Sequence, residues 1–176
     1  MDIEKKRQVE LLSREDIANK VCELGEIIAK DYEGKKLIIV SLLKGSFIFT
    51  ADLVREINIP LMIDFMITSS YGHSEESSGK VKVIQDIDKD LAGYHVLIVD
   101  DIADTGLTMD FVLGHLKSKN PESVKACVLL DKPSRRKAEL EPEYVGFTIP
   151  DKFIVGYGLN YGDYYRNVPY VFAFED

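Results

Sequence analysis

The stretch VLIVDDIADTGLT, residues 96–108, runs from four apolar residues straight into two carboxylates and then into a small, hydroxyl-rich turn. The apolar run predicts a buried strand over 95–99, and the pattern after it predicts a helix over 108–119. Carboxylates that leave a buried strand are costly unless they are solvated, hydrogen-bonded or close to a cation. The stretch therefore indicates a strand-to-helix connection that is also a candidate site.

Strand and helix patterns alternate along the rest of the chain. A helix is expected from the N-cap Ser13 to Gly34, and a second one after Gly45 with an apolar stripe of Phe47, Ala51, Val54 and Ile57. Strands are expected at 37–43, 60–68, 81–87 and 123–130, with short ones at 145–148, 153–155 and 170–173. Residues 68–80 are polar and rich in serine and glycine, which is typical of a solvated loop or a mobile lid.

This alternation predicts an α/β fold in which a mainly parallel, twisted sheet is flanked by helices. The length of 176 residues suits one domain, 1–176. Ligands in such sheets bind at the carboxyl ends of the strands, and the stretch 96–108 lies at one of these ends.

Composition limits the class of protein further. The net charge of −8 argues against general nucleic-acid binding, which needs a basic surface. No apolar run is long enough to span a membrane, and the charged N-terminus has no signal-peptide pattern, so a cytoplasmic protein is expected. Cys22 and Cys127 are too few and too far apart for a disulfide framework or a zinc site.

Residues 104–108 carry groups that suit an anion. Gly106 permits a positive φ or a close approach of the backbone, and successive N–H groups at a helix N-terminus attract a phosphate. Thr105 and Thr108 add hydroxyl donors, while Asp100 and Asp101 suit sugar hydroxyls and Mg²⁺. The plainer alternative is that the acids only solubilise a loop and a threonine caps the helix.

Several motifs together resemble one family. Residues 96–108 closely resemble the phosphoribosyl pyrophosphate (PRPP) motif of type I phosphoribosyltransferases, and SLLKGSF (41–47) looks like the family's pyrophosphate loop. LLDKPSRR (129–136) and IPDKFIVGYGLNY (149–161) look like the purine-binding part of its hypoxanthine-guanine members. The resemblance implies the type I phosphoribosyltransferase fold, with a small hood and a flexible active-site loop.

The resemblance also implies an activity, that of a purine-salvage glycosyltransferase which needs Mg²⁺ as its cofactor. Hypoxanthine or guanine would react with PRPP to give IMP or GMP and pyrophosphate. The family is usually dimeric or tetrameric, so a homodimer or homotetramer is expected.

The family's roles can be carried over to the matching positions. Asp100 and Asp101 would lie near the ribose hydroxyls and Mg²⁺, and Asp104 would be the catalytic proton acceptor beside N7 of the purine. The residues expected to hold the 5′-phosphate are Asp104, Thr105, Gly106, Leu107 and Thr108. Leu107 carries no charge, so the phosphate would rely on backbone and threonine donors.

The remaining roles concern pyrophosphate and the base. Pyrophosphate would be bound by Leu43, Lys44, Gly45 and Arg166, in a loop that often contains a non-proline cis peptide. Lys132 would donate to the purine O6, Phe153 would stack on the base, and the backbone at Ile154 would read its edge. Ser70 and Tyr71, in the flexible loop, would cover pyrophosphate.

Asn160 departs from the family pattern, which usually has an aspartate there that helps to hold a second magnesium ion. An amide oxygen can still coordinate but brings no charge, and the Asn160 carbonyl could accept from an exocyclic amine. Asn160 is therefore expected to contact both purine and metal, with weaker Mg²⁺ binding.

Other interpretations remain open from the residues alone. Lys132 could be exposed, Phe153 and Ile154 could both be core, and Arg166 could be a surface charge. A signalling receiver domain would use Asp131 as its phosphoacceptor, but its acid pair would stand near the N-terminus. A regulator that senses nucleotides without turnover is the second rival.

Overall fold

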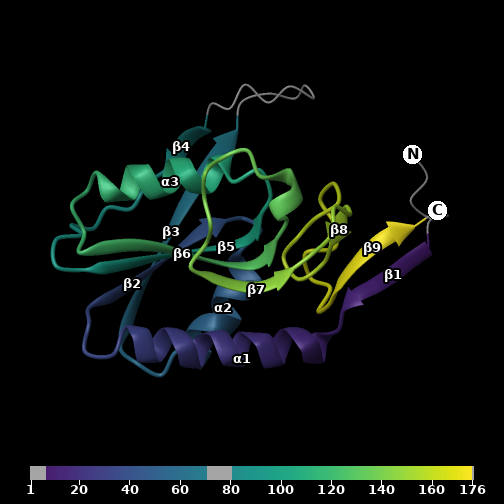
Figure 1. Ribbon diagram of the computed structural model, residues 1–176, viewed down its shortest axis with the longest axis horizontal. Coiled ribbons are helices and arrows are strands. Elements are labelled where there is room, and N and C mark those ends of the chain that lie inside the picture. Colours follow the sequence, from purple (N-terminus) through teal and green to yellow (C-terminus); the bar gives the residue numbers. More distant parts are fainter. Residues whose placement is uncertain (1–6, 71–80, 176) are drawn as a thin grey trace.

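The computed structural model describes residues 7–70 and 81–175 and contains two sheets. The larger has six strands in the order β4-β3-β2-β5-β6-β7, and the smaller has three in the order β1-β9-β8. Helices α1 and α2 cover one face of the larger sheet and α3 covers the other, while the smaller sheet lies at one end of the molecule (Figure 1). This arrangement confirms the predicted α/β class.

The larger sheet is parallel except at one edge. Strands β3, β2, β5, β6 and β7 pair in parallel, whereas β4 pairs antiparallel with β3. The bounds of its strands are β2 Leu37–Leu43, β3 Leu61–Ser70, β4 Val81–Gln85, β5 His95–Ala103, β6 Ser123–Asp131 and β7 Tyr144–Thr148. The carboxyl ends of the central strands therefore meet at the same edge of the sheet.

The smaller sheet joins the two ends of the described chain. Strand β9 (Val171–Glu175) pairs antiparallel with both β1 (Arg7–Leu12) and β8 (Ile154–Val155). Strand β1 is absent from the sequence prediction, because its short segment of alternating apolar and polar residues lies in a charged N-terminus. The segment 153–166, called the hood below, includes β8 of this sheet, and its Gly158 packs against Gly45 at the edge of the larger sheet.

Three α-helices complete the described fold: α1 (Arg14–Asp31), α2 (Phe47–Glu56) and α3 (Leu107–Lys117), with a 3₁₀ turn at Pro133–Arg135. Ser13 caps α1 as predicted, because its hydroxyl accepts from the backbone N–H of Asp16 and the Asp16 carboxylate accepts from the backbone N–H of Ser13. Helices α2 and α3 both begin directly after loops at the carboxyl edge.

Two further details differ from the sequence prediction. The predicted stripe of α2 is correct for Ile57, which is buried, and for Val54, which packs against the core, but Phe47 and Ala51 are exposed. The prediction missed Thr50, a polar residue that is buried and hydrogen-bonded to Ser41 of β2. Strand β5 also continues to Ala103, beyond the predicted end at 99, so both Asp100 and Asp101 lie within the strand.

The core has one part on each face of the larger sheet. One cluster joins α1 and α2 to the sheet through residues such as Ile28, Phe49 and Leu97, and the other lies under α3 around Val112. Strands β2 and β5 are buried on both faces, which explains their unbroken apolar runs. The strands that deliver the candidate site are therefore the most deeply buried ones.

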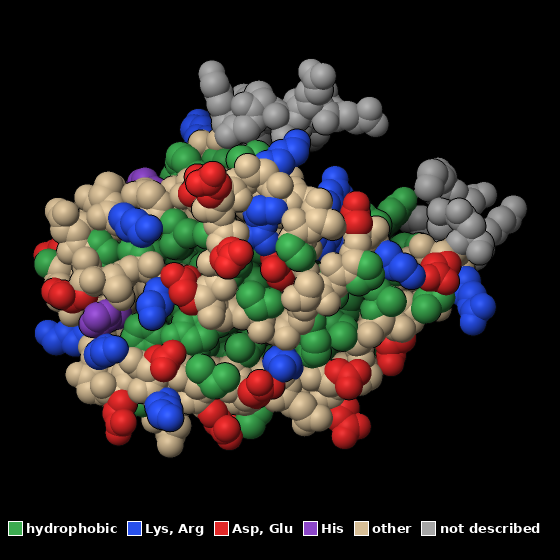
Figure 2. All heavy atoms as spheres, in the orientation of Figure 1, with side chains coloured by type: hydrophobic (Ala, Val, Ile, Leu, Met, Phe, Trp, Pro, Cys, Tyr) green, Lys and Arg blue, Asp and Glu red, His purple; other side chains and the backbone are tan. Residues whose placement is uncertain are grey.

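The surface carries charges of both signs. Figure 2 shows Lys and Arg interspersed with Asp and Glu over the face drawn, without a continuous basic area. In the part of the chain that the structure describes, no helix is both long and apolar enough to cross a membrane.

Helix α1 packs closely on the end of α2 at Gly25. A Cβ at Gly25 would lie 2.5 Å from the Glu56 Cβ. We expect Gly25→Ala to lower the free energy of unfolding by about 1–3 kcal/mol through overpacking, measured by urea denaturation. Gly114→Ala is the matched control, because its Cβ would meet nothing within 4 Å; it should raise stability by roughly 0.5–1 kcal/mol. A Gly25→Ala protein as stable as the parent would contradict this packing.

Candidate active site

Three connections converge at the carboxyl edge of the larger sheet. They are residues 43–46 after β2, residues 100–106 at the end of β5 and the start of α3, and residues 132–136 after β6. Strands β2, β5 and β6 are neighbours in the sheet, so these connections lie side by side. The sequence-predicted groups for pyrophosphate, sugar phosphate and purine thus come to one place.

The loop after β2 packs directly on the end of β5. The Leu43–Lys44 peptide bond is cis, as expected from the resemblance. A Cβ at Gly45 would lie 1.9 Å from Oδ2 of Asp101, so a side chain at this position would have to displace the carboxylate. Lys44 is exposed, and its side chain is available at the edge.

A buried hydroxyl cluster lies below this loop, and the sequence analysis did not find it. The Ser41 Oγ lies 2.7 Å from the Ser46 Oγ and 2.8 Å from the Thr50 Oγ1, and the Ser46 hydroxyl donates to the Leu42 carbonyl at 2.6 Å. All three hydroxyl side chains are buried. The signal was present in the four-residue spacing of Ser46 and Thr50, which places both on one face of a helix.

The hood also contacts the loop after β2. Gly158 packs on the Gly45 carbonyl oxygen, which a Cβ would approach to 2.2 Å. Arg166 donates from Nη1 to the Gly158 carbonyl at 2.6 Å, and the Gly158 N–H donates to the Arg166 carbonyl at 2.9 Å. Arg166 is therefore held beside Gly45, which supports its grouping with the pyrophosphate loop and not with free surface charges.

The turn between β5 and α3 has the shape of an N-terminal anion site. Gly106 caps α3 with φ 80°, a left-handed conformation that favours glycine. The Thr105 carbonyl accepts from the N–H groups of Lys137 and Ala138, which ties the turn to the connection after β6. The first N–H groups of α3 and the helix dipole thus point toward the same edge.

The negative charges of Asp100 and Asp101 have little compensation from nearby cations. Burial and the neighbouring charge of Asp101 raise the pKa of Asp100 well above its ordinary value. Burial also raises the pKa of Asp101, although hydrogen bonds and Arg166 oppose the shift. Among the described residues, no Lys or Arg nitrogen lies within ion-pair distance of either carboxylate, and no cluster of three acidic, His or Cys residues could hold a metal alone.

Asp104 has a different environment, because a cation that the sequence analysis did not assign lies next to it. The Arg135 Nε lies 3.3 Å from the Asp104 Oδ1, and the Arg135 Nη1 lies 3.6 Å from the Asp151 Oδ1. The neighbouring Arg136 pairs with Asp131, so the proposed phosphoacceptor of a receiver domain is already engaged. Arg135 could have been suspected from its place three residues after Lys132 in a motif of known type.

The predicted purine groups have contrasting exposure. Lys132 is only 4% exposed, and its ammonium donates to the Lys152 carbonyl, so the alternative of an exposed lysine is wrong. Phe153 is 61% exposed whereas Ile154 is buried in β8, so the alternative that both belong to the core is wrong too. The rings of Phe153 and Tyr161 pack nearly perpendicular to each other, with their centroids 5.6 Å apart.

The other predicted positions lie on the hood, at the end of β3 and at the start of α3. Asn160 is exposed and donates its amide to the Gly162 carbonyl, which leaves its side-chain oxygen unused by the described residues. Ser70 is the last residue of β3, and Tyr71 lies outside the described residues. Leu107 and Thr108 begin α3 beside the turn.

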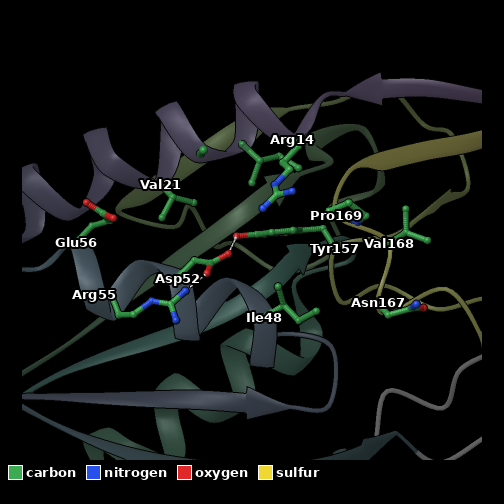
Figure 3. A pocket seen from close by; sticks show the side chains of 12 residues that line it. Arg14, Val21, Ile48, Asp52, Arg55, Glu56, Tyr157, Asn167, Val168 and Pro169 are labelled. Carbon is green, nitrogen blue, oxygen red and sulfur yellow. Dashed lines mark hydrogen bonds and ion pairs between the residues drawn. The ribbon is translucent and has the colours of Figure 1, made fainter.

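A separate cavity of about 340 Å³ lies between α1, α2 and residues 167–169, away from the predicted groups (Figure 3). Inside it, the Tyr157 hydroxyl donates to the Asp52 Oδ2 at 2.5 Å. Since Tyr157 precedes Gly158, this hydrogen bond ties α2 to the hood segment that contacts Gly45.

Comparisons with known proteins agree with this geometry. The chain matches the model of the phosphoribosyl transferase domain over residues 8–162. It is 48% identical to a hypoxanthine-guanine phosphoribosyltransferase of Aquifex aeolicus, covering 94% of each chain. It is also 48% identical to a hypoxanthine phosphoribosyltransferase of Haemophilus influenzae, covering 95% of this chain and 96% of the other.

Solved structures give the same result. A crystal structure of a hypoxanthine phosphoribosyltransferase from Staphylococcus aureus matches with a TM-score of 0.92 and 46% identity, covering 95% of this chain and 91% of the other. A hypoxanthine-guanine phosphoribosyltransferase from Bacillus anthracis matches with a TM-score of 0.90 and 47% identity, covering 94% and 97%. With its parallel sheet, its convergent loops and these relatives, the chain belongs to the phosphoribosyltransferase family.

Proposed function

We propose that this protein is a purine-salvage transferase that joins the 5-phosphoribosyl group of PRPP to N9 of hypoxanthine or guanine. The N9–C1′ bond forms while the C1′–oxygen bond to pyrophosphate breaks, and pyrophosphate leaves with the electron pair. The observation that carries the proposal is the meeting of Lys44, Asp101, Asp104 and Lys132 at one edge, where each family motif ends. The close relatives carry names for the same activity.

The direct test is an assay of the purified protein with PRPP, Mg²⁺ and each of hypoxanthine, guanine and xanthine. We expect IMP from hypoxanthine or GMP from guanine, detected by absorbance and chromatography. Binding of nucleotides without turnover of any purine would favour a regulator instead.

In this proposal the turn 104–108 holds the 5′-phosphate through the N–H groups of α3 and the Thr105 and Thr108 hydroxyls. Lys44, with Leu43 and Gly45, binds pyrophosphate together with Arg166, and these cations stabilise the charge that develops on the leaving group. Asp100 and Asp101 face the ribose hydroxyls. The resemblance assigns Ser70 and Tyr71 to covering pyrophosphate, which would keep water from the ribose cation; Tyr71 lies outside the described residues.

The base would lie between the β6 connection and the hood. Lys132 donates to O6, Phe153 stacks on the ring, and the backbone at Ile154 and Asn160 reads the edge. Exposure of Phe153 and burial of Lys132 support these roles, since a stacking ring must be open and a buried lysine needs strong acceptors.

Mg²⁺ suits the acid pair. Asp100 and Asp101 supply hard oxygen donors, and their raised pKa values mark negative charge that the described residues leave largely unneutralised. We therefore propose that Asp100, Asp101 and Asn160 hold Mg²⁺ with the substrate's oxygens. When bound, the ion would neutralise charge on the departing pyrophosphate.

Asp104 takes the N7 proton as N9 attacks, so its substitution tests the chemistry directly. We expect Asp104→Asn to lower kcat by about 10²–10⁴-fold, the usual contribution of a general base, while PRPP binding persists. Steady-state rates and PRPP titration calorimetry measure the two effects. Asp110→Asn, an exposed acid on α3, is the control and should keep full activity; undiminished turnover in Asp104→Asn would remove Asp104 from this role.

Asn160 is tested through its metal dependence. Asn160→Asp adds a charge to a side-chain oxygen that the described residues leave free, so the Mg²⁺ concentration for half-maximal rate should fall roughly two- to tenfold. A magnesium titration of the initial rate measures it, with the exposed and remote Asn58→Asp as control. An unshifted titration would separate Asn160 from the metal.

We also propose that the chain forms a homodimer or homotetramer. Phe47, Ile63 and Phe65 are exposed, and they lie on α2 and on alternate positions of β3, so they offer apolar surface on one side of the sheet. Light scattering coupled to size exclusion should give at least twice the mass of one chain. A single-chain mass at micromolar concentration would contradict self-association.

A further inference from the structure

Arg135 lies between two acids that come from different parts of the site. Its Nε is 3.3 Å from the Asp104 Oδ1, and its Nη1 is 3.6 Å from the Asp151 Oδ1. Asp104 belongs to the turn after β5, whereas Asp151 precedes the purine-stacking candidate Phe153. Arg135 thus connects the phosphate turn to the purine segment.

The Arg135 guanidinium lies next to only one of the two carboxylate oxygens of Asp104. Oδ1 is buried and accepts no hydrogen bond from the described residues, so the Arg135 guanidinium is its nearby cation. The Asp104 side chain as a whole is 38% exposed, so the part open to solvent lies away from Oδ1. A carboxylate held in this way presents the other oxygen outward as the acceptor.

Asp151, the second acid beside Arg135, also lies near Lys132, the proposed donor to the purine O6. The Asp151 Oδ1 lies 3.9 Å from the Lys132 Nζ, which itself donates to the Lys152 carbonyl. Arg135 and Asp151 therefore link the proton acceptor at N7 with the donor at O6. N7 and O6 lie side by side on the same edge of a purine, so the protein groups that contact them must keep a fixed spacing.

We propose that Arg135 is a positioning residue, which fixes one oxygen of Asp104 and so aims the other at the purine N7 proton. The inference rests on the proposed function, because it assigns Arg135 to the base step of that reaction. Arg135 does not accept the proton; Asp104 does, and Arg135 acts through its orientation. A small error in the direction of a base lowers the rate without abolishing binding.

Arg135 is 50% exposed, so its replacement should leave folding intact. We expect Arg135→Ala to lower kcat by about three- to tenfold, a fraction of a general base's usual contribution, with little change in the KM for PRPP. Arg135→Lys keeps a cation near Asp104 and should recover part of the lost kcat. Lys137→Ala, an exposed cation on the same segment, is the matched control and should behave as the parent.

A double-mutant cycle separates positioning from a merely structural role. In an Asp104→Asn background, Arg135→Ala should cause no further loss of kcat, because the group it aims is gone. The inference is overturned if Arg135→Ala keeps the parent's kcat, if Arg135→Lys is no better than Arg135→Ala, or if the two losses multiply. An inactive parent would instead overturn the proposed function, and this inference with it.

Discussion

The contact between Gly45 and Asp101 constrains the rest of the site. A Cβ on Gly45 would lie 1.9 Å from Oδ2 of Asp101, so the loop after β2 lies directly against the carboxylate at the end of β5. Gly158 packs on the Gly45 carbonyl, and Arg166 donates to the Gly158 carbonyl at 2.6 Å. The contacts of Gly45 thus set where the lysine loop, the acid pair and the hood lie relative to one another.

Helix α2 holds the Gly45 loop and the hood in place through two sets of hydrogen bonds. Its first turn carries Ser46 and Thr50, whose buried hydroxyls join Ser41 in β2 and fix the loop from below. Farther along, Asp52 accepts from the Tyr157 hydroxyl and so holds the hood segment that precedes Gly158. Because buried polar groups are costly when they lose a partner, these hydrogen bonds favour a single position of both segments.

The features that could be predicted from the sequence are those that a local pattern of residues encodes. Unbroken apolar runs identified β2 and β5 because both faces of these strands are buried, and the motif at 96–108 predicted the candidate site. For α2 the pattern was right at Val54 and Ile57 but missed Thr50, which is buried by a tertiary hydrogen bond. It also ended β5 at the first charge, although pairing with β6 continues to Ala103. The sequence placed Arg135 only in a motif beside Lys132, because its contacts with Asp104 and Asp151 join residues that are distant along the chain.

Asp100 and Asp101 have no ion-pair partner among the described residues, whereas Asp104 lies beside Arg135. This difference fits the two proposed roles, metal binding and proton acceptance. Asp100 and Asp101 lie in a packed region without an ion-pair partner among the described residues, so their raised pKa values favour a cation that arrives with the substrate. Asp104 already has Arg135 beside one oxygen. A cation supplied by the chain leaves the other oxygen free for a proton, whereas a shared metal would occupy it. The end of β5 can therefore carry the proposed metal-binding pair, Asp100 and Asp101, while the proposed base, Asp104, directly follows the strand.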